Sequence, residues 1–147
     1  MSITYVNAEL RRLVQSQAEG LCEYCLIAED DTGLGCEVDH IISEKHDGAT
    51  REENLAMACV FCNSAKGSDV GSIIPETGAF IRFFNPRTDR WSEHFFLKDY
   101  RIEPLTVIGR VTVRILQFNS VERLLERQAL ALVKRYPNAA ALKRMAQ

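Results

Sequence analysis

Five cysteines form the clearest chemical pattern in the sequence. Two CxxC pairs, Cys22 with Cys25 and Cys59 with Cys62, are separated by a long insert that contains the fifth cysteine, Cys36. Each pair can present two thiolates to one metal ion, and four thiolates at Zn–S distances of about 2.3 Å suit a closed tetrahedral site. We therefore predict one structural Zn²⁺ on the paired cysteines and interpret Cys36 as a small buried apolar residue.

Side chains in the insert, and just after the second pair, suit phosphodiester hydrolysis. Asp39 and Asn63 offer hard oxygen ligands, which favour Mg²⁺ or Mn²⁺ over zinc. The neighbouring His40 can act as a general base at neutral pH, because an unperturbed histidine has a pKa of about 6.5. The plainer interpretation of His40 is a hydrogen-bonded core residue on an apolar strand.

The spacing of these residues resembles the HNH endonuclease family over residues 22–67. The family's DH, N, CxxCN and KG motifs are matched by Asp39, His40, Asn54, Cys59, Cys62, Asn63, Lys66 and Gly67. The resemblance implies a ββα-metal fold, in which a two-stranded hairpin packs on a helix with one divalent cation between them. It places His40 as the general base and Asp39 and Asn63 as ligands of the cation, with Asn54 bracing the loop that directs His40.

The expected reaction is cleavage of DNA, with double-stranded DNA as the favoured form, to 5′-phosphate and 3′-hydroxyl ends. Mg²⁺ or Mn²⁺ is the expected catalytic cation, with Ni²⁺ as a further candidate. Two other functions stay open. One is a non-catalytic, zinc-ribbon-like module that binds nucleic acid or protein, and the other is a redox protein that uses a CxxC dithiol.

Charge is distributed unevenly along the chain. Residues 1–79 carry five basic and fourteen acidic side chains, and residues 80–147 carry thirteen basic and six acidic ones. The segment FFNPRTDRWSEHF, followed by RIEPLTVIGRVTVRILQFNSVERLLER, also resembles the C-terminal extension of many small bacterial HNH proteins. We hypothesise that this basic extension docks on the nucleic-acid backbone. Candidate contacts, each with a plainer interpretation as surface charge, are Lys66, His46, Arg82, Arg87, Arg90 and Arg101.

Capping and periodicity predict the elements of the first half. Asn7 caps a helix that ends at Gly20, with Leu10, Leu13 and Val14 on its inward face. A strand is expected over residues 36–43 and a turn over 46–50. Thr50 and Glu53 then form a capping box, and a short helix over residues 58–67 ends at Gly67.

The second half is predicted to contain a hairpin of strands 79–84 and 91–97, joined by the turn NPRTDR. Trp91 is expected in the core, with His94 as its hydrogen-bonded neighbour. Thr106 opens a segment that carries Ile108, Val111 and Ile115 at helical spacing. A helix is favoured, although Val111, Val113 and Ile115 also alternate as in a strand. A last helix begins after Ser120, and residues 138–147 fray. Its expected inward side chains are Val121, Leu125 and Leu132, and its outward ones are Arg123, Arg127 and Lys134.

The sequence therefore predicts one α+β domain with a ββα-metal core stapled by a four-cysteine zinc site. Its parts are an N-terminal helix (1–20), a catalytic core (21–70) and an extension of short antiparallel strands and two helices (71–147). No apolar stretch is long enough to span a bilayer, and the opening residues lack the apolar region of a signal peptide. We expect a cytoplasmic protein that acts alone, as a homodimer or with a protein partner.

Overall fold

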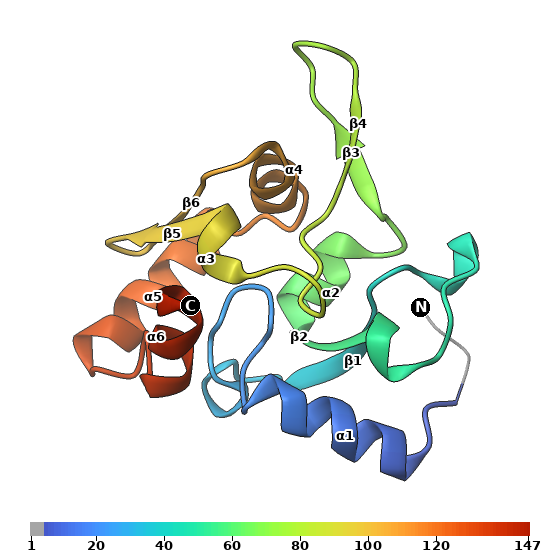
Figure 1. Cartoon of the computed structure of the whole chain (residues 1–147). Helices are drawn as coiled ribbons and strands as arrows, with labels where there is room; N and C mark the ends of the chain where they lie inside the picture. The colour runs from blue at the N-terminus through green and yellow to red at the C-terminus, as the bar shows by residue number, and fades with distance from the viewer. Residues whose placement is uncertain (1–4) are drawn as a thin grey trace.

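A computed structural model describes residues 5–147. Its centre is an antiparallel hairpin of β1 (Cys36–His40) and β2 (Leu55–Cys59), paired from Cys36 with Cys59 to His40 with Leu55. Helix α2 (Val60–Lys66) follows β2 directly and packs on both strands. The hairpin and helix form the expected ββα arrangement (Figure 1).

Helix α1 (Ala8–Ala18) lies along the hairpin and begins as predicted, because Asn7 Oδ1 accepts a hydrogen bond from Leu10 N at 2.8 Å. Its buried face carries Val14 and Ala18, which pack against β2. Leu13 is 41% exposed, so its predicted inward orientation is wrong. Adjacent helix residues are about 100° apart, so the rotation that buries Val14 turns Leu13 toward solvent.

The connection between β1 and β2 contains two 3₁₀ helices, η2 (Glu44–His46) and η3 (Glu52–Asn54), and a third, η1 (Glu29–Asp31), precedes β1. Strand β1 ends at His40, earlier than predicted, because Ile42 N donates to the side chain of Asn54 instead of to a strand partner. The predicted capping box is also wrong. Helix η3 has no side-chain cap, and the hydroxyl of Thr50 contacts His40 instead.

The second half contains two short hairpins whose pairing differs from the prediction. Strand β3 (Gly71–Ile73) pairs with β4 (Phe80–Arg82), and β5 (Phe95–Lys98) pairs with β6 (Arg101–Pro104). Strand β5 pairs with β6 across two residues, which costs less chain entropy than the predicted six-residue connection, whereas β3 and β4 are joined by six residues. Gly71 permits the first pairing, since a Cβ there would lie 2.2 Å from the carbonyl oxygen of Ile81.

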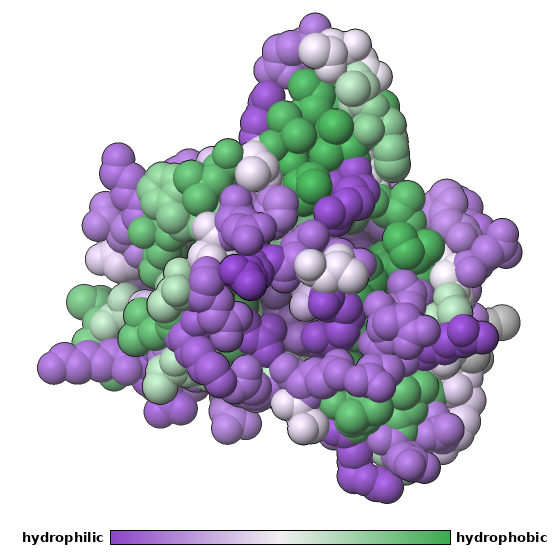
Figure 2. Space-filling view, in the orientation of Figure 1, coloured by the Kyte–Doolittle hydropathy of each residue, from purple (hydrophilic) through white to green (hydrophobic). Residues whose placement is uncertain are grey.

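The β3–β4 hairpin projects from the body of the molecule (Figure 1). On the face shown in Figure 2 an apolar patch covers the middle of this projection below a more polar tip, and the side chains of Ile73 and Phe80 are exposed. Residues Trp91–His94, predicted as strand, form the single-turn helix α3. Trp91 is buried, as expected, and its Nε1 donates to the carbonyl of Tyr24 at 2.8 Å.

Three further helices complete the extension: α4 (Val107–Ile115), α5 (Val121–Leu132) and α6 (Ala139–Ala146). Helix α4 starts as predicted, with Thr106 Oγ1 accepting from Gly109 N at 3.0 Å. The predicted fraying of residues 138–147 is wrong, because Asn138 caps α6 and Ala141 is fully buried.

Helix α5 is rotated relative to the prediction. Arg123 and Arg127 are 3% and 0% exposed, whereas Val121, Leu125 and Leu132 are more than half exposed. The two guanidinium groups reach sulfur atoms and backbone carbonyls that an apolar side chain would leave unpaired. Polar pairing therefore decides which face of α5 is inside.

One core connects the two halves of the chain. Tyr24 and Cys25, from the first CxxC segment, pack in the same buried cluster as Phe84, Phe95 and Phe118 of the extension. Within residues 5–147, no helix is both long and apolar enough to cross a membrane.

Candidate active site and metal centre

The four paired cysteines converge on one point, as predicted. Their sulfur atoms all lie within 4.8 Å of one another and are buried. Cys25 Sγ and Cys59 Sγ are 3.9 Å apart, which matches the edge of about 3.8 Å of a tetrahedron with Zn–S bonds of about 2.3 Å. The donor set therefore fits one tetrahedral metal ion that prefers soft ligands. Cys36 lies outside this cluster and is half-buried.

Arg123 contacts this cluster from helix α5. Its Nη2 donates to Cys25 Sγ at 3.1 Å and its Nη1 to Cys62 Sγ at 3.5 Å. The guanidinium carbon lies 5.1 Å from the ring centre of Phe61. Burial raises the pKa of Cys25, but hydrogen bonds from the three neighbouring thiols, together with the charge of Arg123, outweigh burial and hold this pKa well below its ordinary value. Sequence periodicity alone pointed Arg123 outward.

His40 lies at the end of β1 and is 6% exposed. Its Nε2 is 2.9 Å from Thr50 Oγ1 and 3.9 Å from a carboxylate oxygen of Glu44. Thr50 was not predicted as a site residue, because only the folded connection brings it back to β1. His40 borders a groove of about 320 Å³ that is also lined by Tyr5, Val6, Arg11, Cys36, Glu37 and Val38.

Asn54 holds the β1–β2 connection together. Its Oδ1 accepts from Ile42 N at 2.8 Å, and its Nδ2 donates to the carbonyls of Ile42 and Ala49 at 2.9 Å each. Gly48 packs against the same strand end, where a Cβ would lie 1.6 Å from Ile42 O. The segment that follows His40 is therefore fixed by one side chain and one glycine.

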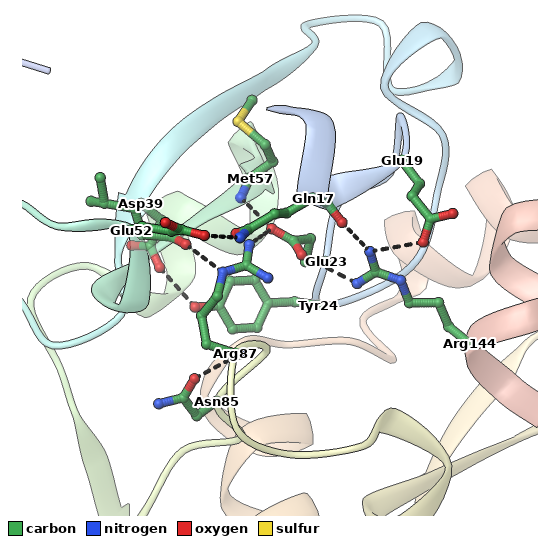
Figure 3. Close-up of polar contacts among 11 residues, drawn as sticks. Gln17, Glu19, Glu23, Tyr24, Asp39, Glu52, Met57, Asn85, Arg87 and Arg144 are labelled. Atoms are coloured by element: carbon green, nitrogen blue, oxygen red, sulfur yellow. Dashed lines mark hydrogen bonds and ion pairs between the residues drawn. The ribbon is translucent and has the colours of Figure 1, made fainter. Parts of the chain in front are cut away.

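Asp39 is 5% exposed, and both of its carboxylate oxygens have partners. Tyr24 donates its hydroxyl to Oδ2 at 2.8 Å, and Lys66 Nζ donates to Oδ1 at 3.2 Å (Figure 3 shows Tyr24 and Asp39). Burial raises the pKa of Asp39, while the charges of Lys66 and the hydrogen bond from Tyr24 act against the rise. Lys66 also donates to His40 O at 2.9 Å and is 1% exposed, so it is a buried partner of Asp39 and is not placed to contact a phosphate.

Asn63 lies on α2 beside strand β1. Its Nδ2 donates to Glu37 Oε2 at 3.2 Å, and Glu37 is two residues before Asp39 on the same face of β1. The structure thus joins Asn63 to this face through Glu37 and gives no direct contact between Asn63 and Asp39. Glu37 is an oxygen donor that the sequence analysis missed, although the two-residue period of a strand could have indicated it.

The arginines predicted as nucleic-acid contacts are mostly paired inside the protein. Arg82 makes a two-pronged contact with Asp89 at 2.7 and 3.0 Å. Arg101 donates to Glu103 at 3.0 Å, and Arg90 lies 3.9 Å from Glu93. His46 is exposed on η2, and His94 Nδ1 lies 2.6 Å from Thr106 Oγ1. The contacts with Asp89 and Glu103 thus place carboxylates next to the positive charges of Arg82 and Arg101, two of the predicted nucleic-acid contacts.

Arg87 belongs to a buried network around Glu23, the residue after Cys22. Glu23 is 1% exposed and accepts hydrogen bonds from Met57 N at 2.9 Å, from Arg87 and from Arg144 at 3.2 Å. Figure 3 shows the two arginines approaching Glu23 from different segments. The extension therefore holds the first CxxC segment through charged contacts.

Comparison with known proteins agrees with this geometry. Residues 22–69 match the family model of the HNH endonucleases. The Septu protein PtuB of Bacillus thuringiensis is 26% identical over 128 residues, which cover 86% of this chain and 47% of that protein. The chain thus spans about half the length of this relative. No solved structure matches the chain significantly. The family match, the ββα arrangement and the four-cysteine cluster agree that residues 22–69 are similar to the HNH endonucleases.

Proposed function

We propose that the protein is a metal-dependent endonuclease that nicks or cuts DNA and leaves 5′-phosphate and 3′-hydroxyl ends. The observation that carries the proposal is the position of His40. It is fixed by Thr50 beside a groove, and Asp39 next to it in sequence faces the helix that carries Asn63. The match of residues 22–69 to the HNH endonucleases supports a nucleic-acid substrate.

His40 is the proposed general base. When Nε2–H donates to Thr50 Oγ1, the lone pair of Nδ1 is left to accept a proton from the attacking water. The hydrogen bond also fixes the ring, so the base does not need to be oriented during the reaction. Thr50 is therefore a positioning residue for His40.

Asp39 and Asn63 are the proposed ligands of a catalytic cation, and we add Glu37 because it contacts Asn63. Carboxylate and amide oxygens suit Mg²⁺ or Mn²⁺, with Ni²⁺ as a further candidate. A divalent cation bound there supplies positive charge to the transferring phosphate and the departing 3′ oxygen. Lys66 supplies the charge that stabilises Asp39 in its ionised form.

The four-cysteine cluster is the proposed site of one structural Zn²⁺. It supplies four sulfur donors, which suit a closed structural site, and it lies at the base of α2, where Cys59 caps the helix that carries Asn63. Metal at this cluster would fix the position of α2 relative to the hairpin.

The test is cleavage of supercoiled plasmid by the zinc-loaded chain at low salt with Mg²⁺, Mn²⁺ or Ni²⁺. We expect His40→Ala to reduce the rate at least 100-fold, since a general base contributes roughly 10²–10⁴-fold. Glu53→Ala is the matched control, because Glu53 is an exposed residue of the same connection with no proposed part in binding or catalysis, and it should retain activity. A folded, zinc-loaded wild type that binds DNA without cutting it would instead favour a non-catalytic binding module.

A further inference from the structure

The side chain of Arg123 is buried against the four-cysteine cluster and is held from three sides. Its two Nη groups contact the sulfurs of Cys25 and Cys62, its Nε donates to Glu126 Oε1 at 2.9 Å, and the ring of Phe61 lies under its guanidinium plane. Fixed in this way, the guanidinium directs its N–H groups at two of the four sulfurs.

Helix α5 is also held by a second buried arginine, which does not contact sulfur. One turn later, Arg127 Nε donates to Tyr100 O at 2.6 Å, and its Nη2 donates to Phe118 O at 2.7 Å. The carbonyls come from the β5–β6 hairpin and from the segment before α5. Arg127 therefore anchors the helix, which leaves Arg123 a separate role at the cluster.

That role follows from charge. Four thiolates around one divalent ion carry a net charge of −2, and the cluster is fully buried. Among the described residues, Arg123 is the only cationic side chain with a hydrogen bond to these sulfurs. An N–H donor on a thiolate stabilises the sulfur lone pair that would otherwise attack an electrophile, and a charged donor does so more strongly than a neutral one.

We propose that Arg123 lowers the reactivity of the metal-bound Cys25 and Cys62 thiolates and so slows metal loss to thiol-directed electrophiles. In such a loss, a sulfur electron pair forms a bond to the carbon of an alkylating reagent, the leaving group departs as an anion, and the metal loses one ligand. Arg123 acts through the two sulfurs and touches neither substrate nor the proposed catalytic cation. The inference is independent of DNA cleavage.

The effect should be specific to two positions. Cys22 and Cys59 receive no hydrogen bond from Arg123, so loss of the guanidinium should change their reactivity less. A variant that merely loosened the fold would expose all four cysteines together. The ratio of reaction rates at the individual cysteines therefore separates the two explanations.

The experiment follows the reaction of the zinc-loaded full chain with iodoacetamide. Zinc release is measured with a chromogenic chelator, and the alkylated cysteines are identified by mass spectrometry. We expect Arg123→Met to increase the alkylation rates of Cys25 and Cys62 about tenfold, because one charged hydrogen bond is worth roughly a factor of ten or more. Arg123→Lys keeps the positive charge but has fewer N–H donors directed at the sulfurs. Its alkylation rates should therefore lie between those of wild type and Arg123→Met.

Arg127→Met is the matched control, since it removes a buried arginine from the same helix without touching sulfur. Equal rates in wild type and Arg123→Met would overturn the proposal, as would an equal acceleration in Arg127→Met. If Arg123→Met does not fold, the proposal is tested with Arg123→Lys in which cobalt replaces zinc, by comparing its absorption spectrum with that of cobalt-substituted wild type. Weaker hydrogen bonding raises the energy of the sulfur lone pairs, so the sulfur-to-cobalt charge-transfer band should move to longer wavelength. An unchanged band would contradict the proposal.

Discussion

Tyr24 connects the four-cysteine cluster to the proposed active site. It stands between Cys22 and Cys25, its hydroxyl donates to Asp39, and its carbonyl accepts from Trp91. Tyr24→Phe removes only the hydroxyl, which leaves a buried carboxylate oxygen with one partner fewer. We expect a loss of about 1–2 kcal/mol in the free energy of unfolding and a higher Mn²⁺ concentration for half-maximal cleavage.

Urea unfolding of the zinc-loaded protein and a Mn²⁺ titration of cleavage measure these two effects. Tyr100→Phe is the control, because within residues 5–147 Tyr100 forms a hydrogen bond with another side chain only through its carbonyl oxygen, which accepts from Arg127, and not through its hydroxyl. Wild-type behaviour of Tyr24→Phe in both assays would show that Tyr24 does not position Asp39.

The site residues that could be predicted from the sequence are those that lie in short motifs with a characteristic spacing. The four cysteines and the pair Asp39 and His40 belong to short motifs with fixed separations. Arg123 could not be found in this way, because it is 98 residues from Cys25 and its helix shows an apolar stripe on the opposite face. A contact made only by tertiary packing leaves no periodic signal.

The connection between β1 and β2 is the element that sets the position of His40. Gly48→Ala should disrupt it, because the new Cβ would lie 1.6 Å from Ile42 O and 2.9 Å from Asn54 Nδ2. We expect a loss of about 2–3 kcal/mol in stability, near the upper range for overpacking, together with reduced cleavage. Thermal unfolding monitored by circular dichroism gives the first quantity. Ala49→Ser, at an exposed neighbouring position, should be nearly neutral.

The turn after β4 is closed by Asp89, which contacts Arg82 and accepts from Asn85 N at 2.8 Å. Burial raises the pKa of Asp89, but these partners outweigh it and lower the pKa below 3.8. Asp89 therefore stabilises the fold above the unfolded-state pKa, and this contribution is lost as pH falls through the lower folded-state value.

Asp89→Asn should accordingly cost about 1 kcal/mol near neutral pH and almost nothing once both forms are protonated. Unfolding free energies of the two proteins, measured across acidic pH, give this difference directly. Asp99→Asn, at an exposed position, is the control. A difference that stayed constant with pH would exclude an ionised Asp89 as its source.

Two predicted helix caps form, whereas the predicted capping box of Thr50 and Glu53 and the predicted pairing of strand 79–84 do not. Asn7 and Thr106 begin α1 and α4 as expected, because a cap needs only neighbouring backbone. The predicted partner of strand 79–84 is wrong, since alternation shows that a segment is extended without showing which strand it joins.

At the scale of the whole molecule, the uneven charge of the chain is largely compensated inside it. Five basic side chains of the extension form ion pairs with acidic side chains of residues 1–79. They are Arg87, Arg110, Arg135, Lys143 and Arg144. Few of the extension's cations are left for phosphates. We therefore expect DNA affinity to depend weakly on salt, with a log–log slope of about −2 to −3.

Fluorescence anisotropy with a short duplex over a range of salt concentrations tests this expectation. A slope of about −6 or steeper would mean that the internal pairs open to contact DNA. In that case Arg110→Gln, which removes an exposed pair with Glu76, should make the slope shallower.

Metal removal should affect both halves of the chain, because they share one core and because Arg123 would remain buried beside four thiols. We expect chelation, with metal loss verified, to lower protection from hydrogen exchange in α5 as well as in residues 22–69. This would support the proposal that residues 1–147 unfold as a single domain. Unchanged protection of α5 would indicate that the extension folds independently.

The distance in sequence between the metal cluster and its arginine also has a consequence for synthesis. Arg123 is 61 residues beyond Cys62, so a ribosome adding roughly 5–20 residues per second needs about 3–12 s to reach it after the last cysteine. During that interval the nascent chain carries four thiols without the guanidinium that later covers them. The newly made protein is therefore most exposed to oxidants and to the wrong metal ion before its C-terminal helices emerge.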